Sequence, residues 1–243
     1  MTLGERLSLG PASILFTTRE GGISAPPYAS LNLSFLTGDD AGCVAENRRR
    51  AVAAAGGDPA FAAGLRQVHG SQIHDARATG TDGFLDGSRA PLEGDGLVTS
   101  EPGLTLAAFG ADCTITALVS SGPRPRVAVV HAGWTGLLGG ALEAAVSAVG
   151  EAPLCVVGPS AGPCCYTVRA AVADPLRRRF GADAVADGRA DLWLCAERAL
   201  RGAGASQVTV LRRCTICDSS LFSHRREGAP GGRQAVLALL HNA

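Results

Sequence analysis

Short runs of almost continuously apolar residues recur along this 243-residue chain, and they constrain its fold more than any other feature of the sequence. A strand covered on both faces is apolar at nearly every position, whereas a strand with one wet face alternates between apolar and polar residues. Glycine, proline and other turn residues bound these runs. The runs therefore predict buried strands at residues 13–17, 64–68, 104–109, 114–119, 126–130, 154–157, 207–211 and 234–240.

Helical patterns fall between the predicted strands. A pair of aspartates can cap a helix over residues 41–55, and apolar residues at helical spacing over 138–149 stop at Gly150. Two further amphipathic segments, 174–180 and 191–202, also predict helices. Because strands and helices follow one another without a regular βαβ alternation, we predict an α+β fold with mixed β-sheets flanked by helices.

Composition indicates a globular chain without a preference for polyanions. Hydrophobic residues make up 46% and charged residues 18% of the chain, which excludes a disordered protein. The 22 basic and 22 acidic residues balance, so we expect neither nucleic acid nor a membrane surface as a partner. No repeat or low-complexity linker divides the chain. We therefore predict one domain over residues 1–243, with a Gly-, Asp- and Pro-rich surface loop at 80–96.

The eight cysteines are expected to be free thiols in a cytoplasmic protein. The first residues lack the apolar run of a signal peptide, and no stretch approaches the roughly 18 apolar residues of a membrane helix. Cys164 and Cys165 are adjacent, which makes a disulfide between them awkward. Cys214 and Cys217 form a C-x-x-C pair that could be redox-active or bind a metal. The chain has no second C-x-x-C to complete a four-thiolate site, so the role of this pair stays open.

Two histidines and one cysteine lie beside the ends of predicted strands and next to small residues. They are His69 in RQVHG, Cys113 in FGADCTI and His131 in RVAVVHAGW. Two imidazoles and a thiolate suit Zn²⁺, and three protein ligands would leave the fourth position open, as catalytic zinc sites do. The spacing matches no local metal motif. A Cys–His nucleophilic pair, or structural roles for all three residues, therefore remain open from the residues alone.

Eleven segments in sequence order resemble one family. They are TTREGGIS, YASLNLS, ENRR, QVHGSQIH, GDGLVT, ADC, VAVVHAGW, VGPSAGPCCYTV, CTICD, FSHRRE and GRQAVLALL. Together they resemble the YfiH-type proteins, labelled polyphenol oxidases or laccase-domain proteins and understood as zinc-dependent purine nucleoside enzymes. The resemblance covers nearly the whole chain. It implies a sandwich fold shared distantly with cysteine-hydrolase toxins of the cytotoxic necrotizing factor type, and a monomer.

The resemblance also implies an activity. It predicts phosphorolysis of adenosine, inosine, guanosine and methylthioadenosine to free base and ribose 1-phosphate, with adenosine deamination as a second activity. Small-molecule nucleoside and phosphate are then the partners, and Zn²⁺ rather than copper is the cofactor. The metal ligands carry over onto His69 in QVHG, Cys113 in ADC and His131 in HAGW.

Further site residues follow from the same resemblance and from their local sequence. Cys113, His131 and Asp112 are the catalytic candidates, and Asp112 could either orient a ligand or accept a proton. We expect the residues that bind substrate or phosphate, or that wall the cleft, to be Arg19, Asn32, Arg48, Trp134 and Tyr166. From residues alone, the turn that carries Arg19 could equally be an ordinary hairpin turn, and Trp134 could be a core residue.

The chain departs from the family pattern near the expected site. Thr114 and Ile115 stand where the family reads ADC-x-P, Thr135 replaces an arginine of HAGWRG, and Thr167 replaces the acidic residue of CYEV. Three alternatives to the nucleoside enzyme therefore remain. They are a metal-free hydrolase or amidase with Cys113 as nucleophile and His131 as base, a copper-dependent phenol oxidase, and a diverged metal-binding accessory protein of cell-wall editing or biosynthesis.

Overall fold

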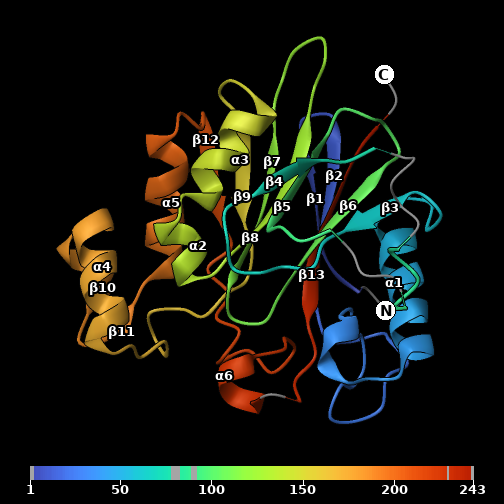
Figure 1. The fold of residues 1–243 in the computed structure, drawn as a ribbon, viewed down its shortest axis with the longest axis horizontal. Helices are drawn as coiled ribbons and strands as arrows, with labels where there is room; N and C mark the ends of the chain where they lie inside the picture. The colour runs from blue at the N-terminus through green and yellow to red at the C-terminus, as the bar shows by residue number, and fades with distance from the viewer. Residues whose placement is uncertain (1–2, 78–82, 89–91, 229, 242–243) are drawn as a thin grey trace.

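Two mixed β-sheets pack face to face in the computed structural model, which describes residues 3–77, 83–88, 92–228 and 230–241 (Figure 1). The first sheet has the strand order β1-β2-β13-β6-β3. Its β6–β3 pair is parallel and its other pairs are antiparallel. Its strands are β1 (Gly4–Leu9), β2 (Ala12–Thr17), β3 (Ala62–Gly64), β6 (Thr105–Gly110) and β13 (Gln234–Leu240).

The second sheet has the order β12-β9-β7-β8-β5-β4. Parallel pairs at its two edges, β12–β9 and β5–β4, enclose antiparallel pairs at its centre. Its strands are β4 (Ile73–Asp75), β5 (Gly96–Thr99), β7 (Thr114–Val119), β8 (Val127–Ala132), β9 (Leu154–Val157) and β12 (Gln207–Val210). The short strands β10 (Val185–Ala186) and β11 (Arg189–Ala190) pair separately.

Every central strand contributes to two apolar layers, which explains its continuous hydrophobicity. In β7, Ala117 and Val119 pack into the layer between the sheets, whereas Leu118 faces the helices on the outer side. In β2, Ile14 and Phe16 join the layer between the sheets, and Leu15 faces the opposite outer side. Successive side chains of a strand point to opposite faces, so a strand between two covered layers must be apolar throughout.

Helices cover both outer faces of the paired sheets (Figure 1). Helix α1 (Ala41–Ala55) packs on the first sheet, and its N-terminus is capped by Asp40, which accepts a hydrogen bond from the Cys43 amide. The second sheet is covered by α2 (Trp134–Leu138), α3 (Ala141–Val149) and α5 (Leu192–Gly202). Helix α4 (Ala170–Phe180) packs against α2 and α5, and the short helices are η1 (Phe35–Thr37), η3 (Ala182–Ala184) and α6 (His224–Glu227).

The predicted α+β fold with mixed sheets is confirmed, and most predicted elements form within a few residues of the expected bounds. The strand predicted at 64–68 was wrong beyond Gly64, because the chain there leaves the sheet toward the site described below. The loop predicted at 80–96 lies partly outside the described residues, and Gly96 begins β5. The helix predicted near 138–149 is two helices, separated at Gly139 and Gly140.

Strands β1 and β4, at sheet edges, and the short strand β5, inside the second sheet, were not predicted. Strand β1 alternates between half-buried and exposed positions in GERLSL, so it lacks the apolar run of a central strand. Strand β4 has only three residues, of which none is fully buried. No helix among the described residues has the length and apolarity needed to cross a membrane.

Leu106→Ala should test the layer between the sheets. Leu106 is fully buried there, so truncation should lower the free energy of unfolding by about 2–5 kcal/mol through lost burial and a residual cavity. Leu36→Ala is the matched control, because Leu36 is 70% exposed and its truncation should change stability by no more than about 0.5 kcal/mol. Urea denaturation followed by circular dichroism measures both. Equal losses in the two variants would contradict this assignment of the core.

Candidate metal centre

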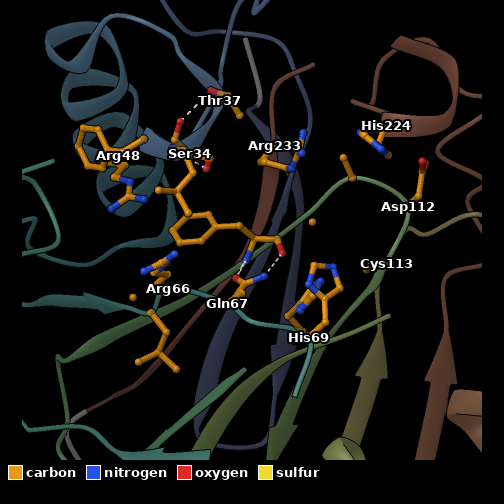
Figure 2. Close-up of a pocket in the computed structure, with 18 of the residues that line it drawn as sticks. Ser34, Thr37, Arg48, Arg66, Gln67, His69, Asp112, Cys113, His224 and Arg233 are labelled. Carbon is orange, nitrogen blue, oxygen red and sulfur yellow. Dashed lines mark hydrogen bonds between the residues drawn. The ribbon is translucent and has the colours of Figure 1, made fainter. Parts of the chain in front are cut away.

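Cys113 lies where the chain crosses from one sheet to the other. Strand β6 of the first sheet ends at Gly110, and β7 of the second sheet begins at Thr114. The residues between them therefore connect the two sheets. Asp112 reverses the chain in this crossing with a φ of 90°, a value uncommon outside glycine but better tolerated by aspartate. The crossing presents the Cys113 side chain to a cavity beside the sheet ends (Figure 2).

The two histidines reach the same point from neighbouring segments. His131 lies near the end of β8, opposite Ile115 of β7 in the sheet register. His69 lies in the loop after β3 and has a φ of 59°, which turns its side chain back toward the crossing. The two imidazole rings meet edge to face, with centroids 4.8 Å apart and an interplanar angle of 85°.

The ligand atoms of His69, Cys113 and His131 lie within 4.8 Å of one another. Tetrahedral zinc with nitrogen ligands at about 2.0 Å and sulfur at about 2.3 Å needs donor atoms roughly 3.3–3.8 Å apart. Small side-chain movements would bring these three donors to that separation. Two imidazoles and one thiolate are ligands that zinc and other borderline metals accept, so the residues can hold one ion.

Gly133 supplies the space that Cys113 requires. A Cβ atom at position 133 would lie 2.8 Å from the Cys113 Sγ and 3.3 Å from the His69 Cδ2. The first of these separations is shorter than any ordinary non-bonded contact. A side chain at this position would therefore displace two of the three candidate ligands.

The carboxylate of Asp95 holds both histidines in place. Its Oδ1 accepts hydrogen bonds from the His131 Nδ1 at 2.9 Å and the His69 amide at 3.0 Å. Its Oδ2 accepts from the Gly70 amide at 2.6 Å and the Val68 amide at 3.3 Å. Because Nδ1 of His131 is used by Asp95, Nε2 is left for a ligand. Such a carboxylate behind a metal-binding histidine fixes its tautomer and orientation.

Without a metal, Cys113 and His131 form a charged pair. Burial opposes ionisation of both groups, but the positive charge of His131 outweighs it and lowers the pKa of Cys113 to about 6. Burial likewise opposes the protonation of His131, and the Cys113 thiolate together with Asp95 raises the pKa of His131 above its usual range. Cys113 is therefore a thiolate at neutral pH, which is the form that binds a metal or acts as a nucleophile.

The three residues open into a cavity of about 500 Å³, a size typical of small-molecule sites. Of the residues predicted from the sequence, Arg48, Asp112, Trp134 and Tyr166 also line it. Figure 2 places Arg48 and Ser34 on one side of this cavity, across from Asp112, Cys113 and His224. The structure thus brings most of the predicted site residues to one place.

Arg48 forms a rigid part of the cavity wall. Its Nε and Nη1 donate to the carbonyl oxygens of Leu33 and Phe84 at 2.8 and 2.6 Å. The guanidinium also stacks between three aromatic rings, those of Phe35, Phe84 and Phe109, at 4.4–4.8 Å. Burial lowers the pKa of Arg48 to about 9. These contacts favour a structural and electrostatic role for Arg48.

Arg19 and Asn32, expected in the same cleft, are not among the described residues that line the cavity. The Arg19 guanidinium binds the Glu227 carboxylate at 2.5 Å and the Ala29 carbonyl, and it stacks on the Phe222 ring. Asn32 is fully buried, and its amide nitrogen donates to Thr37 and Asp39. The structure does not bring them to this cavity, because both side chains hold loops together.

Asp112 has both carboxylate oxygens engaged. Oδ1 accepts from the Thr215 hydroxyl at 2.6 Å, and Oδ2 accepts from the Arg225 amide at 2.7 Å. This geometry favours the orienting role over proton transfer, because Asp112 ties the crossing that carries Cys113 to the segment before β13.

The four departures from the family pattern do not line the cavity. The Thr114 hydroxyl donates to the Ala132 carbonyl at 2.7 Å, and Ile115 is fully buried between the sheets. None of Thr114, Ile115, Thr135 and Thr167 is among the described residues that line the cavity, although three of them directly follow lining residues. The three candidate ligands are themselves all present.

Several residues of the site were not predicted from the sequence. Asp95 stands in the GDG segment, where a carboxylate between two glycines just before a strand is the one available signal. The Gln67 side-chain amide pairs with the Phe109 backbone. Its Nε2 donates to the Phe109 carbonyl and its Oε1 accepts from the Phe109 amide, both at 2.7 Å. His224 lines the cavity with Arg225 and Arg233. These last residues lie more than 100 positions from Cys113, so no local pattern links them to it.

Asp95→Asn should weaken zinc binding by about 10–100-fold, because the amide holds the His131 tautomer and the His69 loop less well. Asp75→Asn is the matched control, since Asp75 is an exposed carboxylate on β4 that pairs with Arg126. Competition with a chromogenic zinc chelator measures both affinities. Unchanged zinc affinity in Asp95→Asn would contradict the role of the Asp95 carboxylate in holding the two histidines.

Comparisons with known proteins agree on one family. The family model described as "Multi-copper polyphenol oxidoreductase laccase" matches residues 13–241. "Purine nucleoside phosphorylase YfiH" of Shigella flexneri is 34% identical over 237 residues, which covers 92% of each chain. "Purine nucleoside phosphorylase" of Deinococcus radiodurans is 38% identical, covering 92% of this chain and 88% of that protein.

Solved structures show the same relationship. The crystal structure of the hypothetical protein YfiH of Bacillus licheniformis superposes with a TM-score of 0.88 at 30% identity, covering 94% of this chain and 92% of that one. YlmD of Geobacillus stearothermophilus gives a TM-score of 0.87 at 32% identity, with coverages of 96% and 93%. The chain therefore belongs to this laccase-like family, whose curated members include the purine nucleoside phosphorylases named YfiH.

Proposed function

We propose that this protein is a zinc-dependent purine nucleoside phosphorylase that also deaminates adenosine. The observation that carries the proposal is the group formed by His69, Cys113 and His131, which opens into a cavity of about 500 Å³ walled by aromatic rings and arginines. The names of the relatives support the reaction class. Adenosine, inosine, guanosine and methylthioadenosine are the proposed nucleosides, and the protein acts as a cytoplasmic monomer.

Zinc fits the donor set better than copper chemistry of the laccase type. A bound zinc ion would supply a Lewis acid with one open coordination position. The chain's own residues orient this site: Asp95 holds the two imidazoles, and Gly133 leaves room for the Cys113 sulfur. The open position would face the cavity because Cys113, His69 and His131 all line it.

Arg233 and Arg225 are the proposed phosphate ligands, in place of Arg19. Both line the cavity, and Figure 2 shows Arg233 between Ser34 and His224. Arg233 is anchored by donating from Nη1 to the carbonyls of Gly231 and Gly232 at 2.8 and 2.9 Å. Arg225 is anchored on Thr167 and stacks 4.7 Å over the Tyr166 ring. Anchored guanidinium groups lose little entropy when they bind an oxyanion.

The purine and ribose would occupy the space beside these groups. Phe35, Phe109, Trp134 and Tyr166 line the cavity and offer apolar surfaces on which a purine ring can stack. Phosphate held by the arginines would then attack the C1′ of the ribose, and the base would leave with the bond electrons. The arginines hold the negative charge of the attacking group and of ribose 1-phosphate.

Incubation of the zinc-loaded protein with inosine and phosphate should release hypoxanthine and ribose 1-phosphate, measured by liquid chromatography. Arg233→Gln should raise the KM for phosphate by about 10–100-fold, because a charge-assisted hydrogen bond contributes roughly 1.5–3 kcal/mol. Arg201→Gln is the control, since Arg201 pairs with Glu197 on the exposed face of α5. Absence of base release from protein with stoichiometric zinc would reject the phosphorylase and favour the diverged accessory protein.

The charged pair of Cys113 and His131 favours a second candidate, a metal-free cysteine hydrolase. His131 is oriented by Asp95, so the three side chains have the arrangement of a nucleophile, a base and an orienting carboxylate. In that mechanism His69 would only help to lower the pKa of Cys113, whereas in a metal site it supplies a ligand. The metal enzyme therefore accounts for one more residue of the cluster.

Alkylation by iodoacetamide separates the two candidates. In protein freed of metal by a chelator, the alkylation rate of Cys113 should rise with pH around a midpoint near 6, because the thiolate is the reacting form and His131 lowers its pKa. Cys43 is an internal control with a higher midpoint, since burial and Asp40 raise its pKa. Added zinc should protect Cys113, as followed by peptide mass spectrometry; alkylation unaffected by zinc would support the hydrolase.

A further inference from the structure

Four cysteines from two loops converge at one edge of the second sheet. Cys164 and Cys165 follow β9, and Cys214 and Cys217 follow β12. Strands β9 and β12 pair in parallel, so the loops after them leave the same edge of the sheet. The chain has no second C-x-x-C, but the adjacent pair Cys164 and Cys165 places two further thiols beside this one.

The four sulfur atoms are close enough to share one ion. All of them lie within 4.8 Å of one another. The Cys217 Sγ is 2.9 Å from the Cys165 Sγ and 3.5 Å from the Cys164 Sγ. In tetrahedral zinc thiolate sites, Zn–S bonds of about 2.3 Å place the sulfur atoms about 3.8 Å apart. The separations of 2.9 and 3.5 Å are shorter than this spacing, so these sulfur atoms would move slightly apart around a bound ion.

The backbone around the cluster is fixed independently of the sulfur atoms. Ser160 and Cys214 form a parallel bridge, with the Thr215 amide donating to the Ser160 carbonyl at 3.0 Å. The Asp218 amide donates to the Cys214 carbonyl at 2.9 Å, which closes the turn of the C-x-x-C pair. The Gly162 amide donates to the Cys214 Sγ at 3.3 Å. An N–H group aimed at sulfur stabilises a thiolate, the form in which cysteine binds metals.

We propose that Cys164, Cys165, Cys214 and Cys217 bind a second zinc ion in a closed, four-thiolate structural site. Four protein ligands leave no position open for substrate, which distinguishes this site from the group of His69, Cys113 and His131. A disulfide between Cys165 and Cys217 would use two of the four thiols and leave Cys164 and Cys214 without a function. One ion uses all four.

The ion would also stabilise two loops that contact the group of His69, Cys113 and His131 or its cavity. The loop that carries Cys214 and Cys217 also carries Thr215, whose hydroxyl holds the Asp112 carboxylate at 2.6 Å. The other loop carries Tyr166, which directly follows Cys165 and lines the cavity. Joining the two loops through one ion therefore fixes the segment behind Cys113 and one wall of the cavity together.

Metal analysis of purified variants tests the proposal without any activity measurement. Protein prepared with reductant and zinc should contain two zinc ions per chain. Cys217→Ser and Cys113→Ser should each contain one, and Cys43→Ser, which alters a thiol on α1 outside both groups, should retain two. X-ray absorption should show sulfur alone at about 2.3 Å around the zinc of Cys113→Ser, and both nitrogen and sulfur around that of Cys217→Ser.

A single zinc in the wild-type protein that Cys217→Ser retains and Cys113→Ser loses would overturn the proposal. Peptide mapping of reductant-treated, zinc-loaded protein that finds a Cys165–Cys217 disulfide would also overturn it. If Cys217→Ser fails to fold, the Cys113→Ser protein decides: a sulfur-only zinc shell supports the site, and the loss of all zinc rejects it. Failure of the phosphorylase activity with two zinc ions bound would reject only the proposed function.

Discussion

The carboxylate of Asp95 is the interaction on which the geometry of the candidate metal centre depends. It accepts hydrogen bonds from three successive backbone amides, those of residues 68–70, and from the ring of His131. One buried group therefore sets both the path of the loop that carries His69 and the tautomer of His131. Neither hydrogen-bond set is strong alone, but together they remove the freedom of two ligands before any ion binds.

The crossing from β6 to β7, one of several between the two sheets, explains why the site lies where it does. Strand β6 belongs to the first sheet and β7 to the second, so the residues between them must turn at the edge of the sandwich. A backbone that changes sheets cannot continue either ladder, and its side chains are presented to the space at the sheet ends. Cys113 occupies that position. The segment before β13 closes the space, because its Arg225 amide binds Asp112 and its Arg233 lines the cavity.

The family description names a multi-copper oxidase, whereas the described residues gather a different set of donors. Among the residues that the structure describes, two groups can hold a metal: His69, Cys113 and His131 in one place, and four cysteines in another. Laccase-type chemistry requires several copper centres, and imidazole-rich clusters suit copper. Within the described part of the chain, both groups contain sulfur ligands, which zinc accepts.

Many of the strands and helices could be predicted from local sequence, because the pattern of apolar residues shows which faces of an element are buried. The apolar runs of β7, β9 and β13 predicted those strands to the residue, since each strand is buried on both faces. The family resemblance identified His69, Cys113 and His131, which the structure brings together. Edge strands such as β1 escaped prediction because partial exposure removes the apolar run.

Tertiary structure alone decided which distant residues share a site. Arg19 and Arg233 both stand next to glycine-rich segments of the sequence. In the structure, Arg19 forms an ion pair with Glu227, and of the two arginines only Arg233 lines the cavity. Cys164 and Cys217 lie 53 positions apart and meet only because β9 and β12 are parallel neighbours. Sequence determines local burial through the pattern of side chains. Convergence depends on strand order and on crossings between sheets, which no local pattern encodes.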